Sequence, residues 1–362
     1  ILILTYQLPI LIGIYPIDVC FVVEKDVNFD VLWTWTFPSV SSSLRDVLLR
    51  KCCLKSEKSQ DITPYLYGQY AKQWYYLYTS TTKNSTVMTK VTHVALAIVA
   101  KDFNPEKYKT LCRILCSKLL QTGSPASILQ GYLSVFTKGS CKDDDDDGAF
   151  TIKEYDPRKA YVEKSVKDVV NIFGVETILI YTALMLKKRV AVYSPRLDTL
   201  LDITRALPLL VWHRQNWSIL YPYVHLEDDE LDDLRSNAVY IAGFTDASIE
   251  DRTELYDLFI NVAAGEISIP SHAKETFQMG KVHKDIAMYM VDASKDEGSS
   301  DQSFIKELST KTKDLIANLK KLAVESEDGS EPKVTLEGLK ERKLTAVMED
   351  FLFNLAAAEG MV

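Results

Sequence analysis

The chain has 362 residues, of which 47% are hydrophobic and 25% are charged. These proportions are typical of a globular protein with a substantial core and exclude a mainly disordered chain, and the length suggests two or three domains. The formal net charge of −8 comes without a basic stripe, which argues against a generic nucleic-acid binder.

The six cysteines form no CxxC pair and no dense framework. We therefore expect reduced thiols in a cytoplasmic protein. Cys112 and Cys116 share a face of a predicted helix, but no second ligand pair accompanies them, so we interpret them as small buried hydrophobes.

Residues 1–16 form an atypical apolar tail. They carry no charge, and Pro9 and Pro16 interrupt the stretch that could otherwise form a membrane-spanning helix. A signal peptide would need a basic beginning and a small-residue cleavage site, which are absent here. We predict no transmembrane segment in the chain.

The pattern of residues 17–138 predicts an antiparallel α+β domain. Two β-rich runs flank a polar turn, and a helix that Ser41 or Ser42 can cap follows them. Three further strands and two helices complete the domain, and Gly123 ends the first of these helices. The predicted strands are 18–24, 31–37, 65–70, 74–79 and 91–100, and the predicted helices are 41–51, 105–120 and 125–137.

Residues 139–157 are predicted to be an acidic linker. Asp143, Asp145, Asp147, Gly148 and Glu154 also satisfy the spacing of an EF-hand calcium loop. Such a loop needs a helix on each side. The glycine before the run and the proline after it disfavour both helices, and five consecutive aspartates fill the spacing easily by chance. We therefore expect no metal site here.

The remaining chain alternates helices and strands over residues 158–270, which predicts an α/β module with a largely parallel sheet. Residues 271–362 read as a helical end. The predicted helices are 164–186, 198–212, 228–236, 271–294, 302–324 and 334–359, and the predicted strands are 189–193, 217–221, 239–244 and two within 258–269 around Gly265.

Sequence motifs of enzymatic sites are missing. Gly280-Lys281 lacks the earlier glycine and the following hydroxyl of a Walker A loop, and no GxGxxG, GxSxG or HExxH occurs. The five histidines are scattered. We predict no catalytic residues and no cofactor, although a catalytic pair that forms only in space stays open.

Aromatic residues provide the candidate binding surfaces. Trp33 and Trp35 share one face of the second strand, which ends at Phe37 and Pro38. We assign Trp33 to the core and the strand end to a partner, because Trp and other anchors are enriched at interface hot spots. Trp212 and Trp217 bracket a second candidate, the basic turn 213–215.

Several long, irregular runs resemble the DENN-domain family. The central DENN module is matched by 187–194, 207–210, 217–222 and 240–244, and the upstream longin-type module by 33–38. A closer match to one branch of the family is carried by 49–54, 100–108 and 210–215. The resemblance covers nearly the whole chain except residues 1–16.

The resemblance implies a bilobed fold, with a longin-like N-lobe and a C-lobe made of a central α/β sheet and a helical end. It implies binding of a Rab-family GTPase across the cleft between the lobes, GDP release, and peripheral association with late endosomes. A non-catalytic scaffold bound to Rab or to coiled-coil subunits of the Commander assembly is the alternative. The residues assigned to GTPase binding are Trp35, Phe37, Pro38, Arg45, Trp212 and Arg214.

Overall fold

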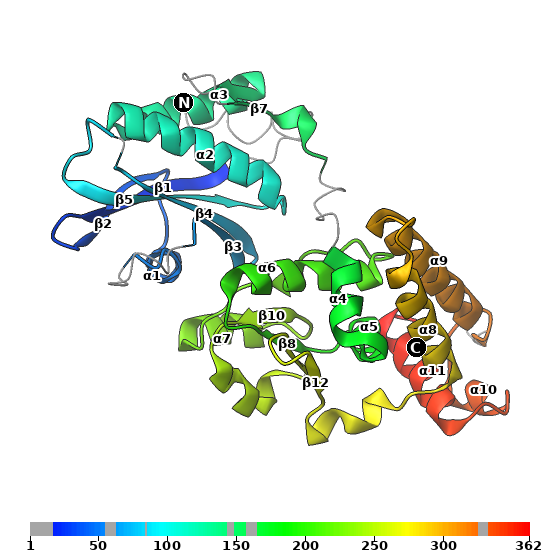
Figure 1. Cartoon of the computed structure of the whole chain (residues 1–362). Helices are drawn as coiled ribbons and strands as arrows, with labels where there is room; N and C mark the ends of the chain where they lie inside the picture. Colours follow the sequence, from blue (N-terminus) through cyan, green and yellow to red (C-terminus); the bar gives the residue numbers. More distant parts are fainter. Residues whose placement is uncertain (1–16, 55–62, 84, 143–147, 157–164, 325–331) are drawn as a thin grey trace. The chain divides into compact units, whose positions relative to one another are not determined.

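The computed structural model describes residues 17–54, 63–83, 85–142, 148–156, 165–324 and 332–362 (Figure 1). The chain divides into two compact units, unit 1 (Ile1–Ala160) and unit 2 (Tyr161–Val362). Each unit has its own sheet and its own buried core, as expected for separate domains.

Unit 1 is built on an antiparallel five-stranded sheet in the order β2-β1-β5-β4-β3. The polar turn between the first two strands is confirmed, and so is the sequence of elements predicted for this half. Gly68 on β3 faces Tyr75 on β4, whose ring fills the space that a Cβ would occupy. The strands are β1 (Ile17–Asp26), β2 (Val31–Phe37), β3 (Tyr65–Tyr70), β4 (Gln73–Thr81) and β5 (Val91–Ala100).

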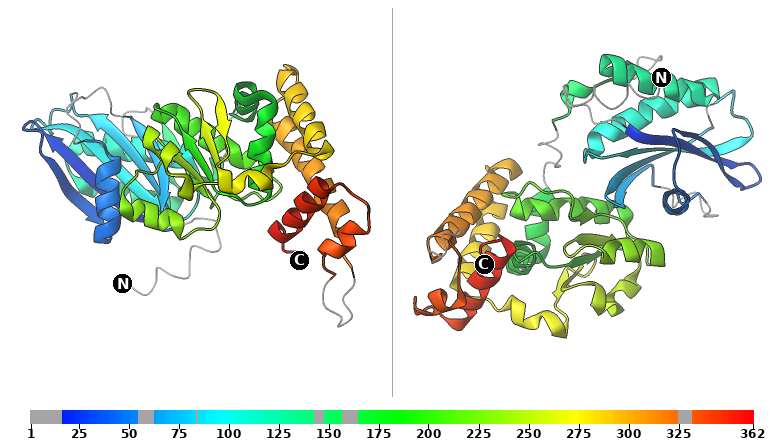
Figure 2. Two further views of the ribbon diagram at one scale, coloured as in Figure 1. Left: turned by 90° about the horizontal axis from the view of Figure 1, so that it is seen from below. Right: turned by 180° about the vertical axis from the view of Figure 1, so that it is seen from behind.

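Helices cover both sides of this sheet. α2 (Pro105–Thr122) packs on β4 and β5, and α3 (Pro125–Lys138) packs on α2. α1 (Ser42–Lys51) lies on the opposite side of the sheet (Figures 1 and 2). The predicted helix ends are confirmed, because Ser41 accepts the Leu44 N–H as N-cap and Gly123 closes α2 with a φ of +65°.

The described ends of the segment predicted as a linker form a small hairpin. β6 (Ser140–Lys142) pairs with β7 (Ala149–Thr151), and both contact α2. Cys141 and Phe150 are buried. These strands therefore extend the core of unit 1, and the division between the units falls later, at residues 160/161.

Unit 2 contains a mixed sheet in the order β12-β11-β8-β10-β9. The β11/β8, β8/β10 and β10/β9 pairs are parallel and only β12 is antiparallel, so the predicted largely parallel sheet is confirmed. Gly265 turns the chain between the last two strands with a φ of +67°. The strands are β8 (Val190–Tyr193), β9 (Leu220–Tyr221), β10 (Ile241–Phe244), β11 (Leu258–Asn261) and β12 (Glu266–Ser268).

The helices of unit 2 are shorter than predicted. The expected helix 164–186 is split at Gly174, whose φ is +54°, and the expected helix 198–212 tightens into a 3₁₀ segment that contains Pro208. The observed elements are α4 (Ser165–Phe173), η5 (Gly174–Glu176), α5 (Thr177–Met185), α6 (Leu197–Ala206), η6 (Leu207–Val211) and α7 (Asp228–Arg235).

Among the described residues, Val166–Met185 is the one stretch long and apolar enough to cross a membrane by length and composition. It spans α4, η5 and α5, and 61% of its apolar window is buried inside the structure. A buried segment that breaks at a glycine is typical of a core helix pair, so we assign it to the core of unit 2.

The helical end also divides further than predicted. The expected helix 271–294 is a 3₁₀ segment that ends at Phe277 and a helix that begins after Gly280. The expected helix 334–359 is broken where Lys343 adopts a φ of +54°. The elements are η9 (Ser271–Phe277), α8 (Lys281–Lys295), α9 (Asp301–Lys320), α10 (Leu336–Lys340) and α11 (Ala346–Ala358).

Candidate functional site

The first candidate surface, which we call the β2 aromatic edge, consists of Trp33, Trp35, Phe37 and Arg45. Trp33 stacks on the buried Phe21 ring, with 4.2 Å between ring centroids and an interplanar angle of 12°. The exposed Arg45 guanidinium on α1 lies 5.2 Å from the Trp33 ring. We predicted that Trp33 belongs to the core, but it is only partly buried, and its ring makes the cation–π contact with Arg45.

The end of β2 carries the exposed part of this edge. The rings of Trp35 and Phe37 lie nearly parallel, 6.5 Å apart, and 41% of Phe37 is exposed. Phe37 is the last residue that pairs with β1, and a cis peptide bond joins it to the exposed Pro38. The prediction that the strand ends at Pro38 is confirmed. Trp35, Phe37 and Pro38 lie together at the end of β2 on unit 1. Arg45 lies on Trp33, which is opposite Val23, whereas Trp35 is opposite Val22, so Arg45 and Trp35 are on opposite faces of the sheet.

A bulge interrupts β2 along this edge. Val22 pairs with Trp35 and Val23 pairs with Trp33, so Thr34 is an extra residue in the strand. Its hydroxyl donates to the carbonyl of Val22. A bulge on an edge strand bends it and disfavours pairing with a further strand, so side chains rather than backbone groups are what this edge offers to a partner.

The second candidate surface is the turn 212–217 of unit 2, where the structure brings Trp212 beside Trp217 with 5.2 Å between ring centroids. Arg214 points inward. Its guanidinium donates to the carbonyl oxygens of Leu184 and Met185, each at 2.7 Å, and to Glu359. Only 17% of the side chain is exposed. The guanidinium therefore closes the carboxyl end of α5 and ties it to the end of α11.

Glu359 is the partner that holds this cluster together. The neighbouring His213 ring and the Arg214 guanidinium, opposed by partial burial, lower the pKa of Glu359 from 4.5 to about 2. The His213 Nε2 atom lies 3.8 Å from the carboxylate, too far for a hydrogen bond, so its contribution is electrostatic. Arg214 was assigned to GTPase binding; that assignment stays a prediction, but the geometry favours a structural role.

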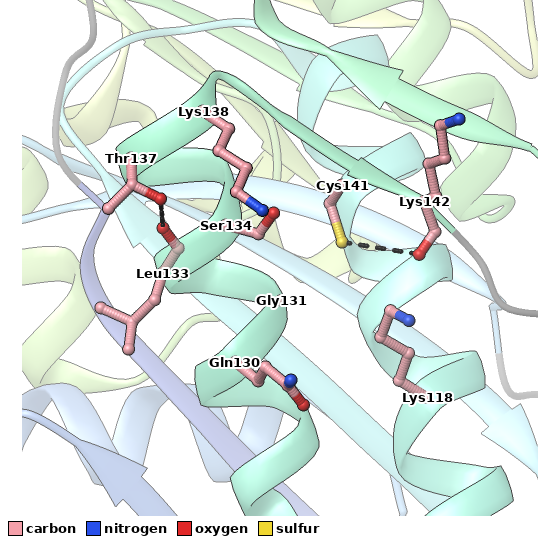
Figure 3. Close-up of a pocket in the computed structure, with 9 residues that line it drawn as sticks. All are labelled: Lys118, Gln130, Gly131, Leu133, Ser134, Thr137, Lys138, Cys141 and Lys142. Atoms are coloured by element: carbon pink, nitrogen blue, oxygen red, sulfur yellow. Dashed lines mark hydrogen bonds between the residues drawn. The ribbon is translucent and has the colours of Figure 1, made fainter.

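Beside α3, unit 1 has a hollow of about 380 Å³ that Lys118, Lys138 and Lys142 surround (Figure 3). Its other polar groups are engaged locally: Thr137 donates to the carbonyl of Leu133, and the Cys141 thiol to that of Lys142. Both of these bonds go to main-chain carbonyls rather than to a side-chain base.

Unit 2 has an apolar hollow of about 280 Å³ that α5 and α8 border. Leu179 and Ala287 line it, together with Val175, which is 55% exposed. Met288 on α8 is also largely exposed. A hollow with apolar helices on both sides is a shape that can accept the apolar face of a partner helix.

The described residues contain no group of three or more His, Cys, Asp or Glu side chains placed to hold a metal ion. Asp143, Asp145 and Asp147 of the EF-hand-like spacing lie outside the described residues, while Glu154 lies in a 3₁₀ turn. The residues that flank the run are strands β6 and β7, whereas an EF-hand loop is flanked by helices.

Comparison with known proteins places these features in a family. Residues 163–271 match the family model SPA, stabilization of polarity axis. The chain is 49% identical to DENN domain-containing protein 10 of Danio rerio over 94% of this chain and 96% of the relative. It is 44% identical to that of Homo sapiens, over 94% and 95%, and 39% identical to that of Dictyostelium discoideum, over 93% and 96%.

Proposed function

Because the chain belongs to the DENN domain-containing protein 10 family, we propose that it regulates a Rab-family small GTPase and promotes exchange of its bound guanine nucleotide. DENN domains are generally regulators of Rab GTPases. In this proposal unit 1 is the longin-like module, and unit 2 combines the central DENN module with the helical end. The protein acts in the cytoplasm and on late endosomes as a peripheral component.

The observation that supports GTPase binding most is the β2 aromatic edge. Trp35 and Arg45 are residue types that dominate interface hot spots, and Arg45 and Phe37 remain exposed on the two faces of this edge strand. A rigid strand and a helix hold these side chains, so little conformational freedom would be lost on binding.

Nucleotide exchange needs no acid, base or metal from the exchange factor. A partner that binds the nucleotide-free GTPase more tightly than the GDP-bound form lowers GDP affinity by the same factor, because coupling between two ligands is reciprocal. An edge that presents aromatic rings and a cation can supply such differential contacts to mobile segments of the GTPase.

The test is Phe37→Ala. Loss of the exposed ring is expected to weaken binding by about 2 kcal/mol or more if Phe37 is an anchor. Because 41% of the residue is already exposed, the melting temperature should change little, unlike the loss of about 3–5 kcal/mol for a core phenylalanine. Release of fluorescent GDP and pull-down across a Rab panel measure the first effect, and a thermal melt measures the second.

Leu133→Ala is the matched control, because Leu133 is a similarly exposed apolar residue of unit 1 that lies on α3. It should leave both binding and GDP release unchanged. Retained binding by a folded Phe37→Ala protein would remove Phe37 from the site.

The α5/α8 hollow favours a second candidate function, a scaffold without exchange activity. A hollow with an apolar, helical border suits coiled-coil subunits such as those of the Commander assembly in endosomal recycling. The rate of GDP release distinguishes the two functions. A scaffold binds the GTPase or the coiled coil without accelerating GDP release, whereas an exchange factor accelerates it.

A further inference from the structure

The tip of the β1–β2 hairpin, which we define as Lys25 to Leu32, exposes apolar side chains to solvent. Phe29 is 70% exposed, and Val27 and Leu32 are each 53% exposed. Single exposed apolar residues need no explanation, but a group of three on one projecting turn does.

The backbone of the tip makes Phe29 more unusual. The turn closes with a hydrogen bond from Asp26 N–H to the carbonyl of Asp30, and Phe29 adopts a φ of +71°. Glycine or asparagine is favoured in this left-handed region, and a bulky residue there is strained. Folding gains nothing from an exposed ring in a strained conformation, so the residue points to a role outside the fold.

Basic groups surround the apolar tip. Lys25 is buried, with its ammonium 5.4 Å from the Phe29 ring. The carbonyl of Lys90 accepts the Val27 N–H, so the Lys90 backbone adjoins the tip. Lys83 follows Thr82, whose N–H donates to the carbonyl of Thr92, and the Thr92 hydroxyl donates to the carbonyl of Lys25, so the Lys83 backbone also lies close to the tip. Lys83 and Lys90 are exposed.

The tip also holds two acidic groups. The Asp26 carboxylate is engaged within the turn, where it accepts hydrogen bonds from the backbone N–H groups of Asn28 and Asp30 and from the Asn28 side chain. Asp30 is exposed. Two exposed lysines, Lys83 and Lys90, therefore face one exposed acid, Asp30, around the tip, since Lys25 is buried.

We propose that the β1–β2 tip inserts Phe29, with Val27 and Leu32, into the headgroup region of an anionic lipid membrane, while the exposed Lys83 and Lys90 meet the lipid phosphates. Aromatic rings are favoured at the membrane interface, and lysines near an anionic leaflet add to binding.

This contact is separate from the proposed GTPase surface. Six residue steps along β2 place Val31 about 20 Å from Phe37, at the other end of the strand. Vesicle binding is measured without a GTPase, so failure of one proposal leaves the other intact.

The experiment is co-sedimentation of the full chain with vesicles of phosphatidylcholine, with and without phosphatidylserine. Phe29→Asn removes the ring and suits the positive φ, so we expect at least a roughly tenfold loss of vesicle affinity with an unchanged or higher melting temperature. Phe29→Trp should retain binding. A Lys83→Glu, Lys90→Glu double variant should lose the preference for phosphatidylserine, and added salt should weaken binding.

Leu133→Ser on α3 is the control for exposed apolar surface, and it should bind as the unaltered chain does. Three results would overturn the proposal: no sedimentation of the unaltered chain, undiminished binding by Phe29→Asn, or an equal loss with Leu133→Ser. Loss of a protein partner by Phe29→Asn with vesicle binding intact would also overturn it and would assign the tip to that protein.

Discussion

The two candidate surfaces pair an arginine with tryptophans in opposite ways. On unit 1, Arg45 is exposed and rests on the face of Trp33. On unit 2, Arg214 lies between Trp212 and Trp217 in the sequence, is mostly buried, and donates to two main-chain carbonyls and to Glu359. An arginine near tryptophans is therefore exposed on unit 1 and structural on unit 2. Only the arginine that is not already bonded to carbonyls and a carboxylate is available to bind another molecule.

The largest effect expected from this comparison is that of Arg214→Ala. The change leaves the carbonyl oxygens of Leu184 and Met185 without their donor and leaves Glu359 without its cation. Removal of one member of a mostly buried ion pair costs about 3–5 kcal/mol. Urea denaturation of unit 2 should show this loss.

Arg214→Lys is the informative companion variant. A lysine keeps the charge, but a single ammonium cannot reproduce a planar fork that donates in several directions, so most of the stability should stay lost. If both variants unfold like the unaltered chain and instead lose GTPase binding, Arg214 belongs to the interface as the sequence predicted.

The second prediction concerns acid. The pKa of Glu359 is about 2 in the folded chain, below its ordinary 4.5, so the folded state favours the ionised carboxylate. Its contribution is fully present above pH 4.5 and is lost as the pH falls from there toward 2. The difference corresponds to at most about 3 kcal/mol of unfolding free energy.

Glu359→Gln should lower stability at neutral pH and flatten the loss of stability in acid. The measurement is a series of urea denaturation curves between neutral and acidic pH. Glu341→Gln, at an exposed position after α10, is the control and should leave the curve unchanged. An acid profile of Glu359→Gln that parallels the unaltered chain would show that this carboxylate does not stabilise the fold through its ionised form.

The contrast between the surfaces also shows which structural features can be predicted from the sequence and which cannot. The bounds of β2 followed from a period of two residues, which is a local property. The prediction that Trp33 and Trp35 share a face was wrong, because the extra residue Thr34 shifts the alternation and the two rings lie opposite Val23 and Val22, on opposite faces. The contact of Arg214 with Glu359 joins residues 145 positions apart, and no local pattern reports it. Its direction could therefore not be predicted.

Helix ends show the same limit. Gly123 ends α2 where predicted, because a glycine that follows an apolar-faced helix is a local signal. Gly174 splits a run whose apolar residues continue on both sides, and its left-handed φ is visible only in the structure. The exposed Phe29 was overlooked for a related reason, since a polar turn with a single phenylalanine resembles any other hairpin turn.

The smallest effect on stability is expected for Arg45, the counterpart of Arg214 on unit 1. Arg45→Ala removes an exposed cation 5.2 Å from the Trp33 ring, a contact that contributes about 0.5–1 kcal/mol in such settings. The thermal melt should therefore hardly change. If Arg45 is also an anchor of the β2 aromatic edge, GTPase binding should fall by about tenfold or more, a loss far larger than the change in stability.

Arg45→Lys separates charge from shape, because lysine retains the cation but cannot stack a planar group on Trp33. Parallel pull-downs and melts of both variants decide the matter: equal, small losses of binding and stability would mean that Arg45 only shields Trp33, and the binding surface would then have to lie on Trp35 and Phe37 alone.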